Sequence, residues 1–212
     1  MTRSRSVLIP ALKWIAAYKD LEVHVKAHEQ QSCLTYYFGT PEVYGEHRSA
    51  TTHMLAYECY RTRDDLYDTH FNSSAMGVFL SKIHASMTTG LDLVHYEDVT
   101  GFLDRANLKE CGVIWDTKLK IKPGKREEIL KRLVKVAEWV ESNEPGTYTY
   151  FIHKGLDDEH EVRILERYAD RSALERHQSG KVLLNFFDES KDLIAQMENH
   201  GYIPNGLGWL HR

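Results

Sequence analysis

The chain has 212 residues, of which 42% are hydrophobic and 27% charged, a composition that is typical of a globular protein and excludes a disordered chain. Its formal net charge of -4 excludes the basic surface that nucleic acid or an anionic membrane would require, and no apolar run is long enough for a membrane span or a signal-peptide core. The three cysteines are far apart, so we expect no disulfide framework and a location in the reducing cytoplasm.

Hydrophobic periodicity divides the first half into alternating strands and helices, although the pattern is weak at its beginning. The expected elements, in chain order, are a strand before Pro10, a helix over 12–31, strands over 33–38 and 52–60, a helix that ends at Met87, and a strand over 91–96. A longer loop separates the second and third of these strands. The order is β-α-β-β-α-β, which is the ferredoxin-like plan.

The second half repeats this order with a clearer pattern. The expected elements are strands over 113–121, 147–152 and 161–168, helices over 125–143, 170–177 and 182–197, and a closing strand over 207–210. Asp170 is expected to cap the second helix, and Pro204, Asn205 and Gly206 are expected to form a turn before the last strand.

The two halves therefore predict an α+β protein made of two ferredoxin-like repeats. We expect residues 1–98 to form the first, degenerate repeat, residues 99–110 a linker, and residues 111–212 the second repeat. A sheet with helices on one face needs a cover for its other face. We therefore expect the repeats to pack sheet-to-sheet, as an intramolecular dimeric α/β barrel with a ligand pocket near the sheets and helices.

Three separated segments of the second half resemble the antibiotic biosynthesis monooxygenase family. They are KPGK at 122–125, NEPG at 143–146 and ERYADRSALERH at 166–177. The resemblance implies a monooxygenase of secondary metabolism that oxidises small aromatic or hydrophobic molecules with O2 and without a cofactor. Some relatives degrade haem, and others are cyclases or isomerases. Because Tyr168 stands where the family often has Trp, and no Asn and Trp pair is found, we do not expect haem. We also expect neither flavin nor metal.

Cofactor-independent oxygenation requires a base, a group that holds the resulting anion, and a dry cavity. The candidate catalytic residues are His177, whose ordinary pKa is about 6.5, with Tyr168 and Glu166 on one face of the same strand. The structural alternative is that His177 only closes its helix and that the tyrosines only fill the core. The candidate substrate-binding residues are Tyr150, Tyr148 and Trp115 and, in the first repeat, Tyr36, Tyr60, His53 and His70.

Two other functions stay open at this point. A non-catalytic binding protein would hold a hydrophobic ligand unchanged, and a cyclase or isomerase would use the same base without oxygen. In all three cases the expected partner is a small hydrophobic or aromatic molecule, with no nucleic acid, no membrane and a homodimer left open. The fold alone does not decide between them.

Overall fold

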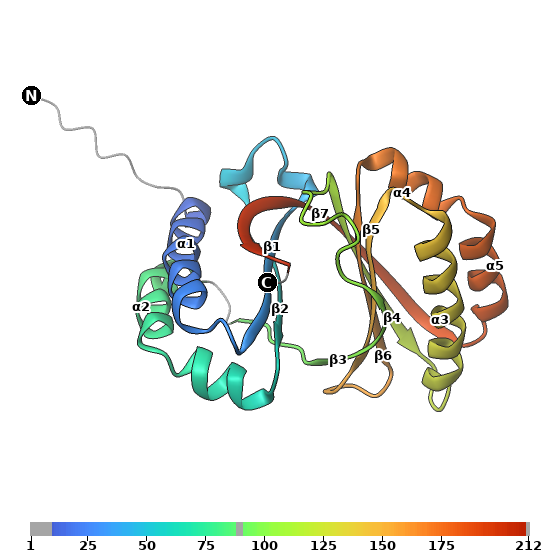
Figure 1. The fold of residues 1–212 in the computed structure, drawn as a ribbon, viewed down its shortest axis with the longest axis horizontal. Helices are drawn as coiled ribbons and strands as arrows, with labels where there is room; N and C mark the ends of the chain where they lie inside the picture. The colour runs from blue at the N-terminus through green and yellow to red at the C-terminus, as the bar shows by residue number, and fades with distance from the viewer. Residues whose placement is uncertain (1–9, 88–90, 211–212) are drawn as a thin grey trace, which may run out of the picture. The chain divides into compact units, whose positions relative to one another are not determined.

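The computed structural model describes residues 10–87 and 91–210, and divides into two compact units. The N-terminal unit comprises Met1–Leu91 and Asn205–Arg212, and the C-terminal unit comprises Asp92–Pro204. Both units combine helices with antiparallel strands (Figure 1). The α+β class with two ferredoxin-like repeats in tandem is thereby confirmed. The strand expected before Pro10 lies outside the described residues.

The N-terminal unit packs two helices on one side of its strands. Its elements are α1 (Pro10–His28), β1 (Cys33–Pro41), η1 (Glu42–Tyr44), η2 (Arg48–Ala50), β2 (Leu55–Tyr60), η3 (Asp65–Phe71), α2 (Ser74–Ile83), η4 (His84–Ser86) and the end of β7. Helix α1 buries Leu21 and Val25, one turn apart, and α2 buries Phe79 and Ile83 in the same core. Tyr36 and Phe38 of β1 complete this core.

The C-terminal unit holds the complete ferredoxin-like sheet. Its elements are β3 (Tyr96–Phe102), β4 (Val113–Ile121), α3 (Arg126–Asn143), β5 (Thr147–Gly155), β6 (Glu161–Tyr168), α4 (Arg171–Gln178), α5 (Lys181–Ser190) and the first part of β7 (Ile194–Trp209). Its strand order is β7-β4-β6-β5-β3, with antiparallel pairing throughout. Helices α3 and α5 cover one face of this sheet (Figure 1), where Ile129, Leu133 and Phe186 pack against it.

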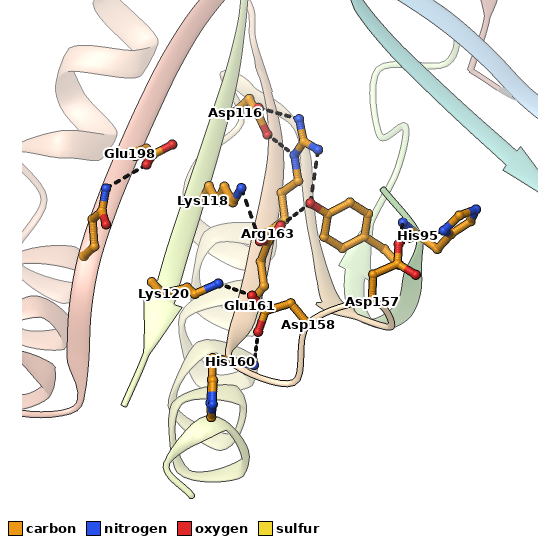
Figure 2. A network of polar contacts seen from close by, with 12 residues as sticks. His95, Asp116, Lys118, Lys120, Asp157, Asp158, His160, Glu161, Arg163 and Glu198 are labelled. Atoms are coloured by element: carbon orange, nitrogen blue, oxygen red, sulfur yellow. Dashed lines mark hydrogen bonds and ion pairs between the residues drawn. The ribbon is translucent and has the colours of Figure 1, made fainter. Parts of the chain in front are cut away.

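The opposite face of the C-terminal sheet is charged. Arg163 of β6 binds Asp116 of β4 through two parallel contacts, with Nε to Oδ1 at 2.6 Å and Nη2 to Oδ2 at 2.7 Å. Its Nη1 also donates to the hydroxyl of Tyr96 in β3 at 3.2 Å, and Tyr96 donates in turn to Glu161. Figure 2 shows this network together with the ion pair from Lys118 to Glu161. The network ties β3 to the two central strands of the sheet.

Most expected elements are confirmed, but the last strand of each repeat is displaced. Residues 194–197, expected to be helical, belong to β7, which also runs through the expected turn at Pro204, Asn205 and Gly206. Helix α5 ends at Ser190 because the chain then pairs with β4, where Met197 lies opposite Leu119. Likewise β3 begins at Tyr96 and enters the expected linker. Pairing with a distant strand overrides the local preference in both places.

The displaced strands occupy matching places in the two units. Strand β3 follows the first repeat in the chain but pairs with β5 in the C-terminal unit, whereas the end of β7 pairs with β1 in the N-terminal unit. Gly101 of β3 has φ +109° and lies against the carbonyl of Tyr150. Gly208 of β7 has φ +80° and lies against the carbonyl of Tyr36. Each unit is therefore completed by a strand that follows the other unit's elements in the chain.

Among the described residues, no helix combines the length and the apolar character that crossing a membrane would require.

Candidate functional site

A cavity of about 230 Å³ lies between the sheet and the helices of the C-terminal unit. Its floor comes from β4, β5 and β6, one wall comes from α4 and α5, and one edge comes from β7. The lining residues are Trp115, Thr117, Tyr150, Ile164, Glu166, His177, Gln178, Leu183, Phe186, Phe187, Met197 and Asn199. Most of this lining is apolar, and its polar groups include the carboxylate of Glu166 and the imidazole of His177. Such a pocket suits a small, largely apolar molecule with one or two polar groups.

His177 is held at the end of helix α4, which starts at the Asp170 cap. The carboxylate of Asp170 accepts a hydrogen bond from the backbone N–H of Ala173 at 2.9 Å, as expected from the sequence. His177 is 2% exposed, and its Nδ1 lies 2.8 Å from Oε2 of Glu144. Because a carboxylate only accepts hydrogen bonds, Nδ1 carries the hydrogen and Nε2 becomes the basic nitrogen.

Glu166 stands on the far side of the imidazole, with its Oε2 4.0 Å from His177 Nε2. Tyr168 donates to that oxygen at 2.5 Å, and Thr117 donates to Oε1 at 2.9 Å. His177 therefore lies between two carboxylates. The positive charge that it gains with a proton is stabilised from both sides.

Burial and the neighbouring charges shift the pKa values of Glu166 and His177 in opposite directions. Burial raises the pKa of Glu166. The charge of the nearby His177 and the hydrogen bonds that Tyr168 and Thr117 donate to Glu166 oppose that rise. Burial by itself would lower the pKa of His177, but the hydrogen bond to Glu144 and the charges of both carboxylates raise it. Burial also holds the pKa of Tyr150 well above its ordinary value. The site thus contains a strengthened base beside a tyrosine that keeps its proton.

The candidate residues of the second repeat occupy different positions around the cavity. His177, Glu166, Tyr150 and Trp115 line it. Tyr168 lies behind Glu166, with its ring centroid 5.5 Å from that of His177. Tyr148 lies outside the lining, where the ammonium of Lys109 sits 5.5 Å from the centre of its ring. Arg167 points to the opposite face and pairs with Asp104 at 3.6 Å.

The sequence analysis missed two groups of site residues, namely two polar residues and the apolar residues of α5. Glu144, which binds His177, stands in the NEPG segment that carries the family resemblance, so a signal for it was present. Thr117 could have been found from the alternation of β4, because it shares a face with Leu119. The apolar wall from α5 had no such signal, since Leu183, Phe186 and Phe187 read as ordinary core residues.

The N-terminal unit contains a second cluster of the same residue types. Its members are Glu29, Tyr36, Glu58, Tyr60 and His70. His70 Nδ1 lies 2.9 Å from Oε2 of Glu29, and Tyr60 donates to Oε2 of Glu58 at 2.9 Å. The structure therefore brings together three of the four candidate residues of the first repeat. His53 is exposed and instead contacts the hydroxyl of Thr52 at 3.2 Å.

Comparison with known proteins identifies the domain in which this site lies. Residues 113–189 match the family model for antibiotic biosynthesis monooxygenase. The resemblance found in the sequence is thereby confirmed, and the matched domain contains Glu144, Glu166 and His177. None of the curated proteins matches the chain significantly.

Solved structures extend the likeness over nearly the whole chain. A candidate monooxygenase from Lactobacillus acidophilus NCFM is 16% identical with a TM-score of 0.72, and the match covers 94% of this chain and 89% of that one. A candidate monooxygenase from Fusobacterium nucleatum is 15% identical with a TM-score of 0.72, covering 99% and 90%. An anthrone oxidase-like protein is 15% identical with a TM-score of 0.62, covering 90% and 84%. At these identities the likeness establishes a shared fold.

Neither cluster resembles a metal centre. Within residues 10–87 and 91–210, no group of three or more His, Cys, Asp or Glu side chains has an arrangement that could hold a metal ion.

Proposed function

We propose that the C-terminal cavity is the active site of a cofactor-independent monooxygenase that oxidises a small aromatic or hydrophobic molecule with O2. The observation that carries the proposal is the position of His177, buried between Glu144 and Glu166 and open to a mostly apolar cavity. A base of this kind can remove a proton from an acidic C–H or O–H group of the substrate. The matched domain supports oxygenation over other uses of that base.

The proposed reaction balances without an external reductant. For a CH2 group made acidic by a neighbouring ring and carbonyl, His177 Nε2 takes one proton, and the carbanion forms a C–O bond with O2. The peroxide takes the proton back from His177. Removal of the second C–H proton then breaks the O–O bond, which leaves a carbonyl and a hydroxide that becomes water with the proton from His177. The CH2 group and O2 are converted to C=O and H2O, and the substrate supplies every electron.

The other residues act on charge and position. The hydroxyl of Tyr150, kept protonated by burial, is placed to donate to an enolate or phenolate oxygen in the cavity. Glu144 fixes the orientation of the imidazole, and Glu166 stabilises its protonated form. Tyr168 holds Glu166 in place and does not touch the substrate. Trp115, Ile164 and the α5 side chains keep water out.

The cavity limits the size of the substrate. Its volume of about 230 Å³ lies below the usual range of about 300–1,000 Å³ for drug-sized ligands, so we propose a molecule of one or two rings. Our proposal retains the remaining expectations from the sequence, namely an enzyme of secondary metabolism in the cytoplasm.

Oxygen consumption with a panel of hydroquinones, naphthols and anthrone-like CH acids tests the proposal. We expect uptake of O2 with a one- or two-ring member, and His177→Ala should lower kcat by about 100-fold or more because the base is lost. His200→Ala is the matched control, because this histidine of β7 is exposed, does not line the cavity, and has its Nε2 3.8 Å from Oε2 of Glu198. Binding without uptake would instead favour a carrier, and turnover in the absence of oxygen would favour a cyclase or isomerase.

A further inference from the structure

The cluster in the N-terminal unit reproduces several contacts of the cluster in the C-terminal unit. The histidine-to-carboxylate distance is 2.9 Å for His70 and Glu29, against 2.8 Å for His177 and Glu144. The ring centroids of Tyr60 and His70 are 5.5 Å apart, as are those of Tyr168 and His177. The second tyrosine of each cluster also faces the imidazole, with Tyr36 at 6.0 Å from His70. Each of the five positions is thus filled by the same residue type.

Strand register shows that these are equivalent positions. Tyr36 pairs with Glu58 across β1 and β2, as Tyr150 pairs with Glu166 across β5 and β6. Both strand pairs also carry the same irregularity two residues from the strand start, between Cys33 and Thr35 in one and between Thr147 and Thr149 in the other. Two strand pairs with the same register and the same bulge place their side chains alike.

The surroundings of the two clusters have diverged. The residue between the carboxylate and the tyrosine is Arg167 in β6 but Cys59 in β2, so the buried ion pairs of Arg167 have no equivalent there. Where Thr147 donates to Glu144 at 2.8 Å, β1 has Cys33. A buried histidine with two nearby carboxylates is costly to keep, because its charges lose their hydration. Its presence in both units, beside a changed neighbourhood, points to a use for both.

One buried polar atom of the N-terminal cluster lacks a hydrogen-bond partner. The hydroxyl of Tyr36 is fully buried and makes no hydrogen bond. Oε1 of Glu29 makes no hydrogen bond either, but it lies 3.7 Å from Nε2 of His24. The equivalent of Tyr36 in the C-terminal unit, Tyr150, lines the cavity. Buried polar groups are normally hydrogen-bonded, so an unpaired hydroxyl beside a histidine indicates a place for a polar group from outside the protein.

We propose that the N-terminal unit carries a second ligand site, in which Tyr36, Glu58 and His70 bind a small phenol and accept its proton. This inference rests on the proposed function for the nature of the ligand. The phenol O–H bond breaks, and its proton passes to His70 Nε2, the nitrogen not bound to Glu29. The hydroxyl of Tyr36 donates to the phenolate oxygen, and Glu58 and Glu29 balance the charge of the imidazolium. The chain then holds two sites of one chemistry.

Anaerobic titration with 4-nitrophenol tests this inference, because its phenolate is coloured and proton transfer is seen directly. We expect the full chain to bind two equivalents, His70→Ala and His177→Ala to bind one each, and the double variant to bind none. Cys59→Ser is the control, because its side chain points away from Glu58 and Tyr60 on the same strand, and it should keep two. If His70→Ala does not fold, as judged by thermal melting, Tyr36→Phe removes only the hydroxyl and should halve the phenolate formed.

The outcomes separate this inference from the proposed function. Saturation at one equivalent that His70→Ala leaves unchanged would overturn the second site, whether or not the protein consumes oxygen. Two equivalents without oxygen uptake from any member of the substrate panel would support the second site and overturn the monooxygenase. No binding of 4-nitrophenol to the full chain would overturn the second site.

Discussion

The N-terminal and C-terminal units share a buried cluster but differ in what surrounds it. In the C-terminal unit, Thr117 and Thr147 complete the hydrogen bonds of the two carboxylates, and a cavity opens beside the histidine. In the N-terminal unit, Cys33 replaces one donor, and Phe79 of α2 packs tightly on Tyr18 at 4.5 Å between ring centroids. Strand register places the cluster alike in both units, whereas the residues that surround it differ.

The largest effect on stability is expected from substitution of the glycines in β3 and β7, the strands that complete the two units. Gly101→Ala and Gly208→Ala would each force a methyl group onto a backbone carbonyl at a positive φ. We expect each substitution to lower the free energy of unfolding by about 3 kcal/mol or more, because neither strain nor overlap can relax in a paired strand. Urea denaturation measures this.

Two other glycines separate the effect of a positive φ from the effect of steric overlap. Gly124→Ala also has a positive φ, +73°, but meets nothing within 4 Å, so it should cost only about 1 kcal/mol. Gly77→Ala lies in helix α2 with open space and should stabilise by about 0.5–1 kcal/mol. If Gly208→Ala were as mild as Gly124→Ala, the equivalence of the exchanged strands would be wrong.

The carboxylates that bind the two histidines give an intermediate effect. Glu144→Gln removes a charge that raises the pKa of His177, so the rise of activity with pH should move to lower pH. We expect kcat to fall about 10-fold, since the imidazole loses orientation but not its basic nitrogen. A pH profile of kcat and KM measures both changes.

Two matched variants test whether the shift of the pH profile is specific to the carboxylate of the C-terminal site. Glu141→Gln, an exposed neighbour at the end of α3, should change nothing. Glu29→Gln should leave the profile of the C-terminal site in place and weaken only 4-nitrophenol binding at the N-terminal one. An unshifted pH profile in Glu144→Gln would contradict its positioning role.

The smallest expected effect is on how stability depends on pH. Burial raises the pKa of Glu166 in the folded protein, so the folded state favours its protonated form. The stability from this group is complete below its unfolded pKa, about 4.3, and is lost as the pH rises through the folded value. Glu166→Gln should therefore flatten the fall in unfolding free energy above pH 4.5, which urea denaturation at a series of pH values measures.

Glu58 offers the comparison for this last effect. Burial raises its pKa in the same direction, but the side chain is only partly buried, so solvent screens part of the cost. Glu58→Gln should flatten the curve less than Glu166→Gln. Equal effects in the two variants would mean that the carboxylates are equally buried in solution.

The sequence predicted local elements well and distant pairings poorly. The strands Val113–Ile121 and Glu161–Tyr168 were found with their exact ends, because alternation and flanking Pro, Gly and Asp residues mark them. Only the end of strand β7 was predicted, as a strand over 207–210, because its partners, β4 in one unit and β1 in the other, lie far away in the chain. Periodicity reports a residue's face and says nothing about which strand lies beside it.

In the site, too, residues in one local segment were predicted well and contacts between distant residues were not. His177 and Glu166 could be proposed because they lie in one short segment that resembles a known family. The link from His177 to Glu144 joins residues 33 apart, and that from Thr117 to Glu166 joins residues 49 apart. Such contacts depend on the folded sheet and leave no trace in spacing. The cluster in the N-terminal unit was harder still, because Glu29 follows a helix with no family segment around it.

The exchange of last strands has a consequence for how the protein is made. The N-terminal sheet is completed by Leu207 and Trp209, which are synthesised long after β1. The C-terminal sheet, in contrast, already holds β3 when its other strands are synthesised. A nascent chain therefore exposes the edge of β1 until β7 has been synthesised, and a product that terminates before β7 would keep that edge open to aggregation.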